Sequence, residues 1–96
     1  MNLNQLPYCV YVLYSLKDGK LYIGYTTNLE RRFTEHQAGN SKSTAPRRPF
    51  RLLFCEYYLS KEDAIRREKY FKTTAGKKTI KLMLKESLKE IADDQL

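Results

Sequence analysis

One acidic residue, Glu68, stands where the sequence otherwise predicts apolar side chains. Within its predicted helix, Glu68 lies on the same face as Ala64 and Phe71. A charged carboxylate among apolar neighbours is costly unless it is paired with a base or bound to a cation. Two interpretations follow: Glu68 binds a divalent metal ion, or it forms an ion pair with a base such as Arg67 or Lys72.

A second polar pair, Arg32 and His36, lies one turn apart on another predicted helix and therefore on one side of it. Both residues border the apolar stripe of Leu29 and Phe33, which directs them toward the rest of the fold. An arginine stacked on a histidine can form a site for an anionic phosphate. A histidine at such a boundary is also compatible with a purely structural role.

A β-hairpin is predicted near the start of the chain. Residues 8–16 and 21–26 consist mainly of aromatic, β-branched and aliphatic residues, as is typical of strands with buried faces. Residues 17–20 between them include Asp18-Gly19, a pair that favours a tight turn because such turns need positive φ angles.

The hairpin places two tyrosines on one face of the predicted sheet. With the Asp-Gly pair at the tip, Tyr11 is expected opposite Thr26 and Leu13 opposite Gly24, so that Tyr11 and Tyr22 face the same side. Gly24 then leaves a gap beside the tyrosines. A glycine within a strand marks the close approach of a ligand or another backbone, or a β-bulge.

The middle of the chain predicts a helix, a loop and a third strand. Asn28 is a good helix N-cap and Gly39 a good helix end, which together predict a helix over residues 29–38. Residues 40–49 have the polar, basic and proline-containing composition of a loop. Residues 51–58 are apolar and aromatic enough for a strand.

Two helices are predicted to follow. Ser60 and Asp63 resemble a capping box, and the helix that they open is expected to run to about Thr73, before Gly76. Helical spacing then predicts one last amphipathic helix with Ile80, Leu84, Leu88 and Ile91 on its apolar face. The order strand, strand, helix, strand, helix, helix indicates an α/β (α+β) fold. We expect a single small domain over residues 1–96, with a three-stranded, antiparallel-type sheet flanked by helices.

The net charge of the chain indicates which class of molecule it binds. The chain has 96 residues, and 18 Lys and Arg against 11 Asp and Glu give a net charge of +7, which favours a polyanion such as nucleic acid. No apolar run is long enough for a membrane span and no secretory signal is evident, so we expect a cytoplasmic location and no membrane partner. Cys9 and Cys55 lack zinc-site spacing and are expected to pack as free thiols.

The segments around the two tyrosines resemble the GIY-YIG nucleases, a family that includes homing endonucleases, restriction enzymes and the N-terminal nuclease of the bacterial excinuclease. Val10-Tyr11 corresponds to the end of the first signature triplet, and Tyr22-Ile23-Gly24 matches the second triplet in full. The spacing between Tyr11 and Tyr22 is that of known members. Cys9 stands where the first triplet usually has glycine. The chain is most similar to the small stand-alone bacterial members of the family.

The resemblance also covers the polar residues of the two predicted helices. Arg32 falls at the catalytic arginine of the family, His36 at its nearby helical histidine or tyrosine, and Glu68 at its single metal-binding glutamate. The similarity extends over residues 8–76, most of the chain. No asparagine occurs after Asn40, so the late active-site asparagine of several members has no counterpart.

The resemblance implies a metal-dependent endonuclease that hydrolyses DNA phosphodiester bonds by single-metal water attack, in DNA repair or recombination. Glu68 is the expected ligand of one Mg²⁺ or Mn²⁺ ion. Arg32 is expected to stabilise the phosphate charge, and Tyr11 to orient or deprotonate the attacking water with a proton relay through His36. Tyr22 is expected to position the water or the phosphate.

Further residues are candidates for contacts with the DNA backbone rather than for chemistry. They are Gly24, Arg47, Arg48, Arg51, Lys72, Lys77, Lys78 and Lys81. Two other functions stay open. The missing asparagine and the small size are compatible with a weakly active or inactive nucleic-acid-binding module, and the fold can also serve as a protein-interaction scaffold. A monomer or weak dimer is expected.

Overall fold

A computed structural model of the protein describes residues 6–94. Its elements follow the chain as β1 (Tyr8–Ser15), β2 (Leu21–Thr26), α1 (Leu29–Ala38), the 3-10 helix η2 (Ala45–Arg47), β3 (Phe50–Tyr58), α2 (Lys61–Phe71), α3 (Thr74–Met83) and α4 (Lys85–Asp94). The predicted fold class is confirmed, because a three-stranded antiparallel sheet is flanked by helices. No helix within residues 6–94 is both long and apolar enough to cross a membrane.

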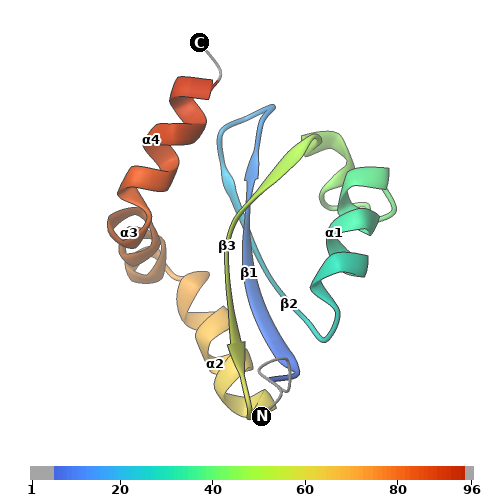
Figure 1. The fold of residues 1–96 in the computed structure, drawn as a ribbon, viewed down its shortest axis with the longest axis vertical. Helices are drawn as coiled ribbons and strands as arrows, with labels where there is room; N and C mark the ends of the chain where they lie inside the picture. Colours follow the sequence, from blue (N-terminus) through green and yellow to red (C-terminus); the bar gives the residue numbers. More distant parts are fainter. Residues whose placement is uncertain (1–5, 95–96) are drawn as a thin grey trace.

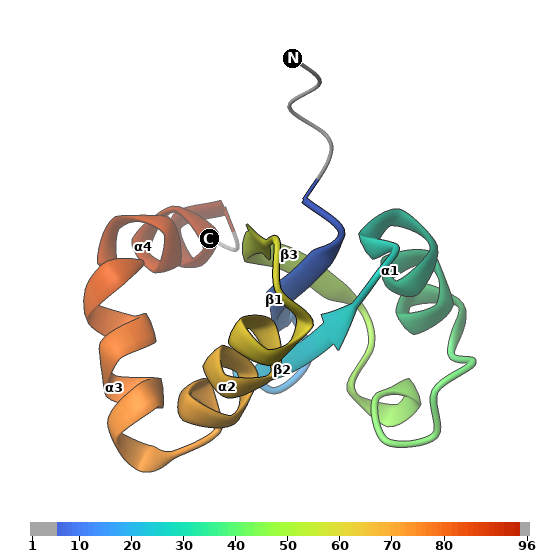
Figure 2. The same cartoon turned by 90° about the horizontal axis from the view of Figure 1, so that it is seen from below.

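The sheet separates two layers of helices. Its strand order is β2-β1-β3, so β1 is central and β2 and β3 are the outer strands. Helix α1 covers one face of the sheet, and α2, α3 and α4 lie on the other side (Figure 1). The same division is visible after a rotation by 90° (Figure 2).

The central strand is buried on both faces because each face is covered by a helix layer. Val10 and Val12 point into the core on the side of α2 and α3, and Cys9, Tyr11 and Leu13 point into the core on the side of α1. All five side chains are at most 1% exposed. This two-sided burial explains the nearly continuous apolar run in the sequence of β1.

The cysteines pack as the sequence predicts. Cys9 belongs to the core on the α1 side, and the partly buried Cys55 packs against it from β3. Both are free thiols.

The hairpin turn is wider than predicted. A backbone hydrogen bond from Ser15 N to Lys20 O (3.0 Å) closes a four-residue loop in which Gly19 has a φ of 71°. Asp18 does not adopt the positive φ that a two-residue turn would require of it. Instead, the Asp18 carboxylate accepts a hydrogen bond from the Lys20 amide (2.8 Å).

The wider turn changes the predicted register by two residues. Tyr11 lies opposite Gly24, not Thr26, and Leu13 lies opposite Tyr22, not Gly24. Because side chains alternate with a period of two, this shift keeps every residue on its predicted face. Tyr11 and Tyr22 therefore share the α1 side of the sheet, and both pack into its core.

Helix α1 begins and ends as predicted. The Asn28 side chain caps the helix by accepting a hydrogen bond from the Arg31 amide (3.0 Å). Gly39 ends it with a φ of 80°, a left-handed conformation that favours glycine. The third strand, Phe50–Tyr58, begins one residue earlier than predicted.

The start of α2 differs from the predicted capping box. Ser60 is the N-cap residue, but its side chain makes no capping bond and its hydroxyl instead donates to Glu62 (3.0 Å). Asp63 pairs with Arg66 (2.9 Å), so its carboxylate does not reach back to the helix start.

The predicted end of α2 is two residues too late, and Gly76 lies inside the next helix. The helix ends at Phe71, and the Thr73 side chain caps the next helix by accepting a hydrogen bond from the Gly76 amide (3.0 Å). Gly76 is buried in the first turn of α3, where an added Cβ would collide with the backbone carbonyl of Tyr70. Glycine is needed there for close packing of α2 and α3, not to end a helix.

The prediction of one last helix is also wrong. The chain leaves helical geometry at Leu84 (φ −112°, ψ 23°), which separates α3 from α4 and gives seven principal elements in the order β-β-α-β-α-α-α. Ile80 on α3 and Ile91 on α4 are both buried. The break lets α4 change direction, and Asp94 near its end pairs with Arg51 of β3 (2.7 Å).

Candidate active site

Three aromatic rings form a compact group between the sheet and α1. The centroid of the His36 ring lies 5.0 Å from that of Tyr22 and 5.9 Å from that of Tyr11, and the two tyrosine centroids are 6.3 Å apart. Gly24 makes this arrangement possible, because an added Cβ at this position would collide with the Tyr11 ring. The predicted gap beside Gly24 is therefore filled by Tyr11.

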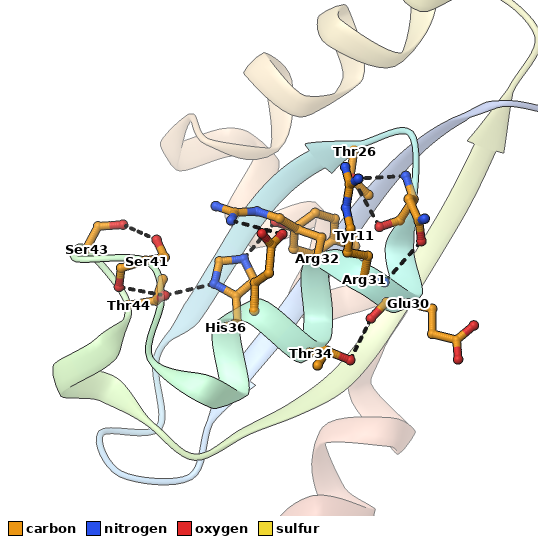
Figure 3. A network of polar contacts seen from close by, with 12 residues as sticks. Tyr11, Thr26, Glu30, Arg31, Arg32, Thr34, His36, Ser41, Ser43 and Thr44 are labelled. Carbon is orange, nitrogen blue, oxygen red and sulfur yellow. Dashed lines mark hydrogen bonds and ion pairs between the residues drawn. The ribbon is translucent and has the colours of Figure 1, made fainter.

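A hydrogen-bonded chain runs from Tyr11 through His36 to the loop after α1 (Figure 3). The Tyr11 Oη lies 2.9 Å from Nε2 of His36, and Nδ1 of the same ring lies 2.8 Å from Oγ1 of Thr44. His36 and Thr44 are both fully buried. Burial, and then the charge of Arg32, lower the pKa of His36, so the imidazole is neutral at neutral pH.

Burial raises the pKa of Tyr11 to about 12, and the neighbouring Tyr22 acts in the same direction. Hydrogen bonding to Arg32 and the charge of its guanidinium oppose the rise, whereas the carboxylate charge of Glu68 adds to it. Tyr11 is therefore a neutral phenol at neutral pH. Arg32 from α1 lowers the pKa of this hydroxyl and Glu68 from α2 raises it.

Arg32 faces the two phenols from α1. Burial disfavours its charged form, but its interactions with Tyr11 and Tyr22 outweigh this effect and raise the pKa of the guanidinium. The side chain is 32% exposed, and its only carboxylate neighbour within the described chain is Glu35, at 3.8 Å. A guanidinium that is partly exposed and only loosely paired still has donors available for an anion.

Glu68 is paired with a base, which is one of the two arrangements that the sequence leaves open. Its carboxylate lies 3.2 Å from Nζ of Lys72, one turn along α2. The Glu68 side chain is 20% exposed and that of Lys72 is 53% exposed, so the pair lies at the surface on the lysine side. Arg67 is engaged elsewhere, with Glu56 at 2.7 Å.

The donor set at Glu68 is a single carboxylate. Within residues 6–94, no three His, Cys, Asp or Glu side chains cluster as a multi-ligand metal site. An isolated carboxylate suits a hard divalent cation that keeps several waters and takes its remaining oxygens from a substrate phosphate. It does not suit a structural zinc site, which needs about four protein ligands.

The basic candidates are distributed over more than one place in the structure. Arg47 and Lys77 are brought together with Lys20 and Lys81 around a cavity of about 270 Å³ beside Gly19 and Leu21. Arg51 lies elsewhere and is paired with Asp94. Arg48 donates a hydrogen bond to the Ala45 carbonyl (2.9 Å), and Lys78 is exposed next to the cavity-lining Lys77.

Sequence reasoning missed Thr44. The residue lies in a polar loop whose composition predicts exposure, yet its side chain is fully buried against His36. The signal that would have found it is the need of a buried histidine for a partner on each ring nitrogen, which directs the search to hydroxyl groups in the adjacent loop.

Comparison with known proteins identifies the family. The model of the GIY-YIG catalytic domain matches residues 7–81, which include Tyr11, Tyr22, Arg32 and Glu68. The chain therefore belongs to the GIY-YIG family of nuclease domains.

Within that family, the chain is similar to a group of small proteins named UPF0213. A UPF0213 protein of Staphylococcus haemolyticus is 43% identical over 77% of this chain and 90% of its own length. One from Streptococcus agalactiae is 44% identical over 71% of this chain and 77% of its own length. The solution NMR structure of the UPF0213 protein BH0048 from Bacillus halodurans has a TM-score of 0.50 and 40% identity, covering 79% of this chain and 81% of that one.

Proposed function

We propose that the protein is a metal-dependent endonuclease that hydrolyses DNA phosphodiester bonds in DNA repair or recombination in the cytoplasm. The observation that carries this proposal is the contact of 2.9 Å between the Tyr11 hydroxyl and the imidazole of His36, which lies on the same helix as Arg32. Family membership supports the same activity. As a purely structural cluster, these residues would gain little from a partly exposed guanidinium beside two phenols.

Glu68 is the residue that would hold the metal ion. The pairing with Lys72 is compatible with this role, because the ammonium group is more than half exposed and can turn toward solvent or a phosphate when a cation replaces it. A Mg²⁺ or Mn²⁺ ion at Glu68 would supply Lewis-acid stabilisation to the phosphate and the leaving oxygen. One protein carboxylate is sufficient for such an ion when water and substrate complete its coordination.

Arg32 binds the scissile phosphate. Its planar guanidinium can hold a non-bridging oxygen and stabilise the charge that develops in the pentacovalent transition state. Its interactions with Tyr11 and Tyr22 orient the group before the substrate arrives. Tyr22 lies on the same side of the sheet and positions the water or the phosphate.

Tyr11 activates the attacking water through a proton relay. The water gives one proton to the Tyr11 oxygen while the phenol proton moves across the 2.9 Å contact to Nε2 of His36. The water oxygen forms a bond to phosphorus, the bond from phosphorus to the leaving oxygen breaks, and the leaving oxygen takes a proton from solvent. The relay avoids a free phenolate, which the raised pKa of Tyr11 disfavours.

The cavity lined by Lys20, Arg47, Lys77 and Lys81 binds the DNA backbone beside the site. Among the described residues, none of the three lysines has a carboxylate within 4.0 Å, so their charges are available to a phosphate. Arg47, which also lines the cavity, is held in place by an ion pair with Asp18 (2.9 Å). The other basic candidates, Arg48, Arg51, Lys72 and Lys78, make at most peripheral backbone contacts.

The test is a cleavage assay on plasmid and branched DNA with magnesium, with manganese and with a chelator. Wild type is expected to cut with either metal and not with the chelator. Glu68→Ala is expected to lose at least about 100-fold in rate, while Glu62→Ala, a matched change of an exposed glutamate on the same helix, keeps full activity. Activity that survives the Glu68 change, or a wild type that cuts nothing, would overturn the proposal.

A second function has one observation in its favour. The ion pair between Glu68 and Lys72 satisfies the carboxylate without a metal, as expected of a nucleic-acid-binding module with a vestigial site. The same preparations separate the two functions, because DNA binding without cleavage under all metal conditions identifies the module. Absence of both binding and cleavage identifies a scaffold.

A further inference from the structure

We propose that Thr44 is a positioning residue whose hydroxyl fixes His36 in the tautomer protonated at Nδ1, leaving Nε2 free to accept the proton of Tyr11. The mechanistic value of this arrangement rests on the proposed function. The tautomer itself does not, because it follows from the hydrogen bonds of buried groups.

The donors and acceptors define the direction of the chain. A carbonyl only accepts hydrogen bonds, so the Thr44 hydroxyl, which donates to the carbonyl of Ser41, presents its oxygen to His36 as an acceptor. The ring hydrogen then lies on Nδ1 of His36, 2.8 Å from the Thr44 oxygen, and Nε2, 2.9 Å from the Tyr11 hydroxyl, carries the lone pair. A neutral imidazole with a lone pair on Nε2 carries its hydrogen on Nδ1.

Thr44 completes the chain at the other ring nitrogen. Its Oγ1 lies 2.8 Å from Nδ1, where it accepts the ring N–H, and its own hydrogen points to the carbonyl of Ser41 at 3.5 Å. That hydroxyl bond is long and weak, but the same carbonyl accepts hydrogen bonds from the amides of Thr44 (3.2 Å) and Ala45 (2.8 Å), which hold the loop in place. The acceptor for the Nδ1 hydrogen therefore has a fixed position.

Because it is buried, the Thr44 hydroxyl cannot easily be replaced by water as the partner of His36. Thr44 and His36 are both fully buried, so water does not replace the hydroxyl without a change in the surrounding packing. A valine at position 44 has nearly the same shape but no acceptor for the Nδ1 hydrogen. The tautomer protonated at Nε2 would then be favoured. In that tautomer Nε2 has no lone pair to accept the proton of Tyr11.

The experiment uses the fact that His36 is the only histidine in the chain. Two-bond ¹⁵N–¹H correlation NMR on ¹⁵N-labelled protein distinguishes protonated from unprotonated ring nitrogens without further assignment. Wild type and Thr44→Ser are expected to show a protonated Nδ1 and an unprotonated Nε2. Thr44→Val is expected to lose this preference. A wild type protonated at Nε2, or an unchanged ring in a folded Thr44→Val, would overturn the proposal.

Kinetics provide a second readout. Thr44→Val is expected to lower kcat about tenfold or more with KM nearly unchanged, and Thr44→Ser to restore it. A rise in KM at constant kcat would instead indicate a role in substrate binding and would contradict the assignment. If wild type shows the expected tautomer but cuts no DNA, the proposed function fails while the role of Thr44 in fixing the ring holds. The wild-type spectrum decides the tautomer even if Thr44→Val does not fold.

Discussion

The ring of Tyr11 lies directly over the backbone of Gly24 in the neighbouring strand, so that the second strand contributes space to the site instead of a side chain. Gly24→Ala is expected to displace the ring and to destabilise the fold by about 1–3 kcal/mol through overpacking. Chemical denaturation measures the loss. In a Tyr11→Ala background the same Gly24 change should have little effect on stability, and an equal loss in both backgrounds would contradict the relationship.

The proposed role of Arg32 predicts that lysine at this position supports a much lower cleavage rate than arginine. Arg32→Lys is expected to reduce the cleavage rate about 100-fold or more, because lysine keeps the charge but not the forked donors that hold a phosphate. DNA affinity should change much less than the rate. Arg31→Lys, a change at an exposed neighbour on the same helix, is the matched control and should leave the rate unchanged. Equal effects of the two changes would exclude a specific role for Arg32.

The cavity beside β2 predicts a change in the salt dependence of binding. A Lys77→Glu, Lys81→Glu double variant is expected to weaken DNA binding and to lower the slope of log K against log salt by about 0.9 for each phosphate that the protein no longer neutralises. Fluorescence anisotropy at several salt concentrations gives this slope. Lys85→Glu with Lys89→Glu on α4 changes the net charge equally but lies away from the cavity. Identical slopes for the two double variants would show that only net charge matters.

The buried His36 predicts a dependence of stability on pH. Burial lowers its pKa below the ordinary value of 6.5, so between the two values the unfolded chain binds a proton that the folded chain does not. Stability is therefore highest above about pH 6.5 and falls as the pH drops below it, with a slope of at most about 1.4 kcal/mol per pH unit for one proton. Denaturant titrations between about pH 7.5 and 5 measure the slope. The His36→Gln variant should lack this dependence, and a flat profile for wild type would contradict the assignment.

The sequence predicts an element correctly where a local geometric requirement selects one type of residue. Asn28 and Gly39 define both ends of α1 because a side-chain acceptor and a left-handed glycine are what the two helix ends require. Side-chain alternation in β1 and β2 predicts the faces of Tyr11 and Tyr22 correctly even though the predicted register is wrong, since a shift of two residues preserves the face.

The predictions that failed depended on contacts between segments. The sequence predicts a helix end before Gly76, and only the close approach of the Tyr70 carbonyl explains why glycine is needed inside α3. The break at Leu84 leaves the helical spacing of apolar residues intact, so periodicity alone predicts one helix across it. Thr44 has no local signal at all, because its partner on the previous helix is what makes its hydroxyl matter.

The position of β2 at the rim of the sheet has a consequence for the shape of substrate that can reach the site. Tyr22 and Gly24 belong to this outer strand, whose far edge pairs with no other strand of the sheet within residues 6–94. Under the proposed function, a nucleic acid is expected to approach this rim sideways, without threading a terminus through an enclosed tunnel. Covalently closed circles, which offer no terminus, are then expected to be cut as readily as linear molecules.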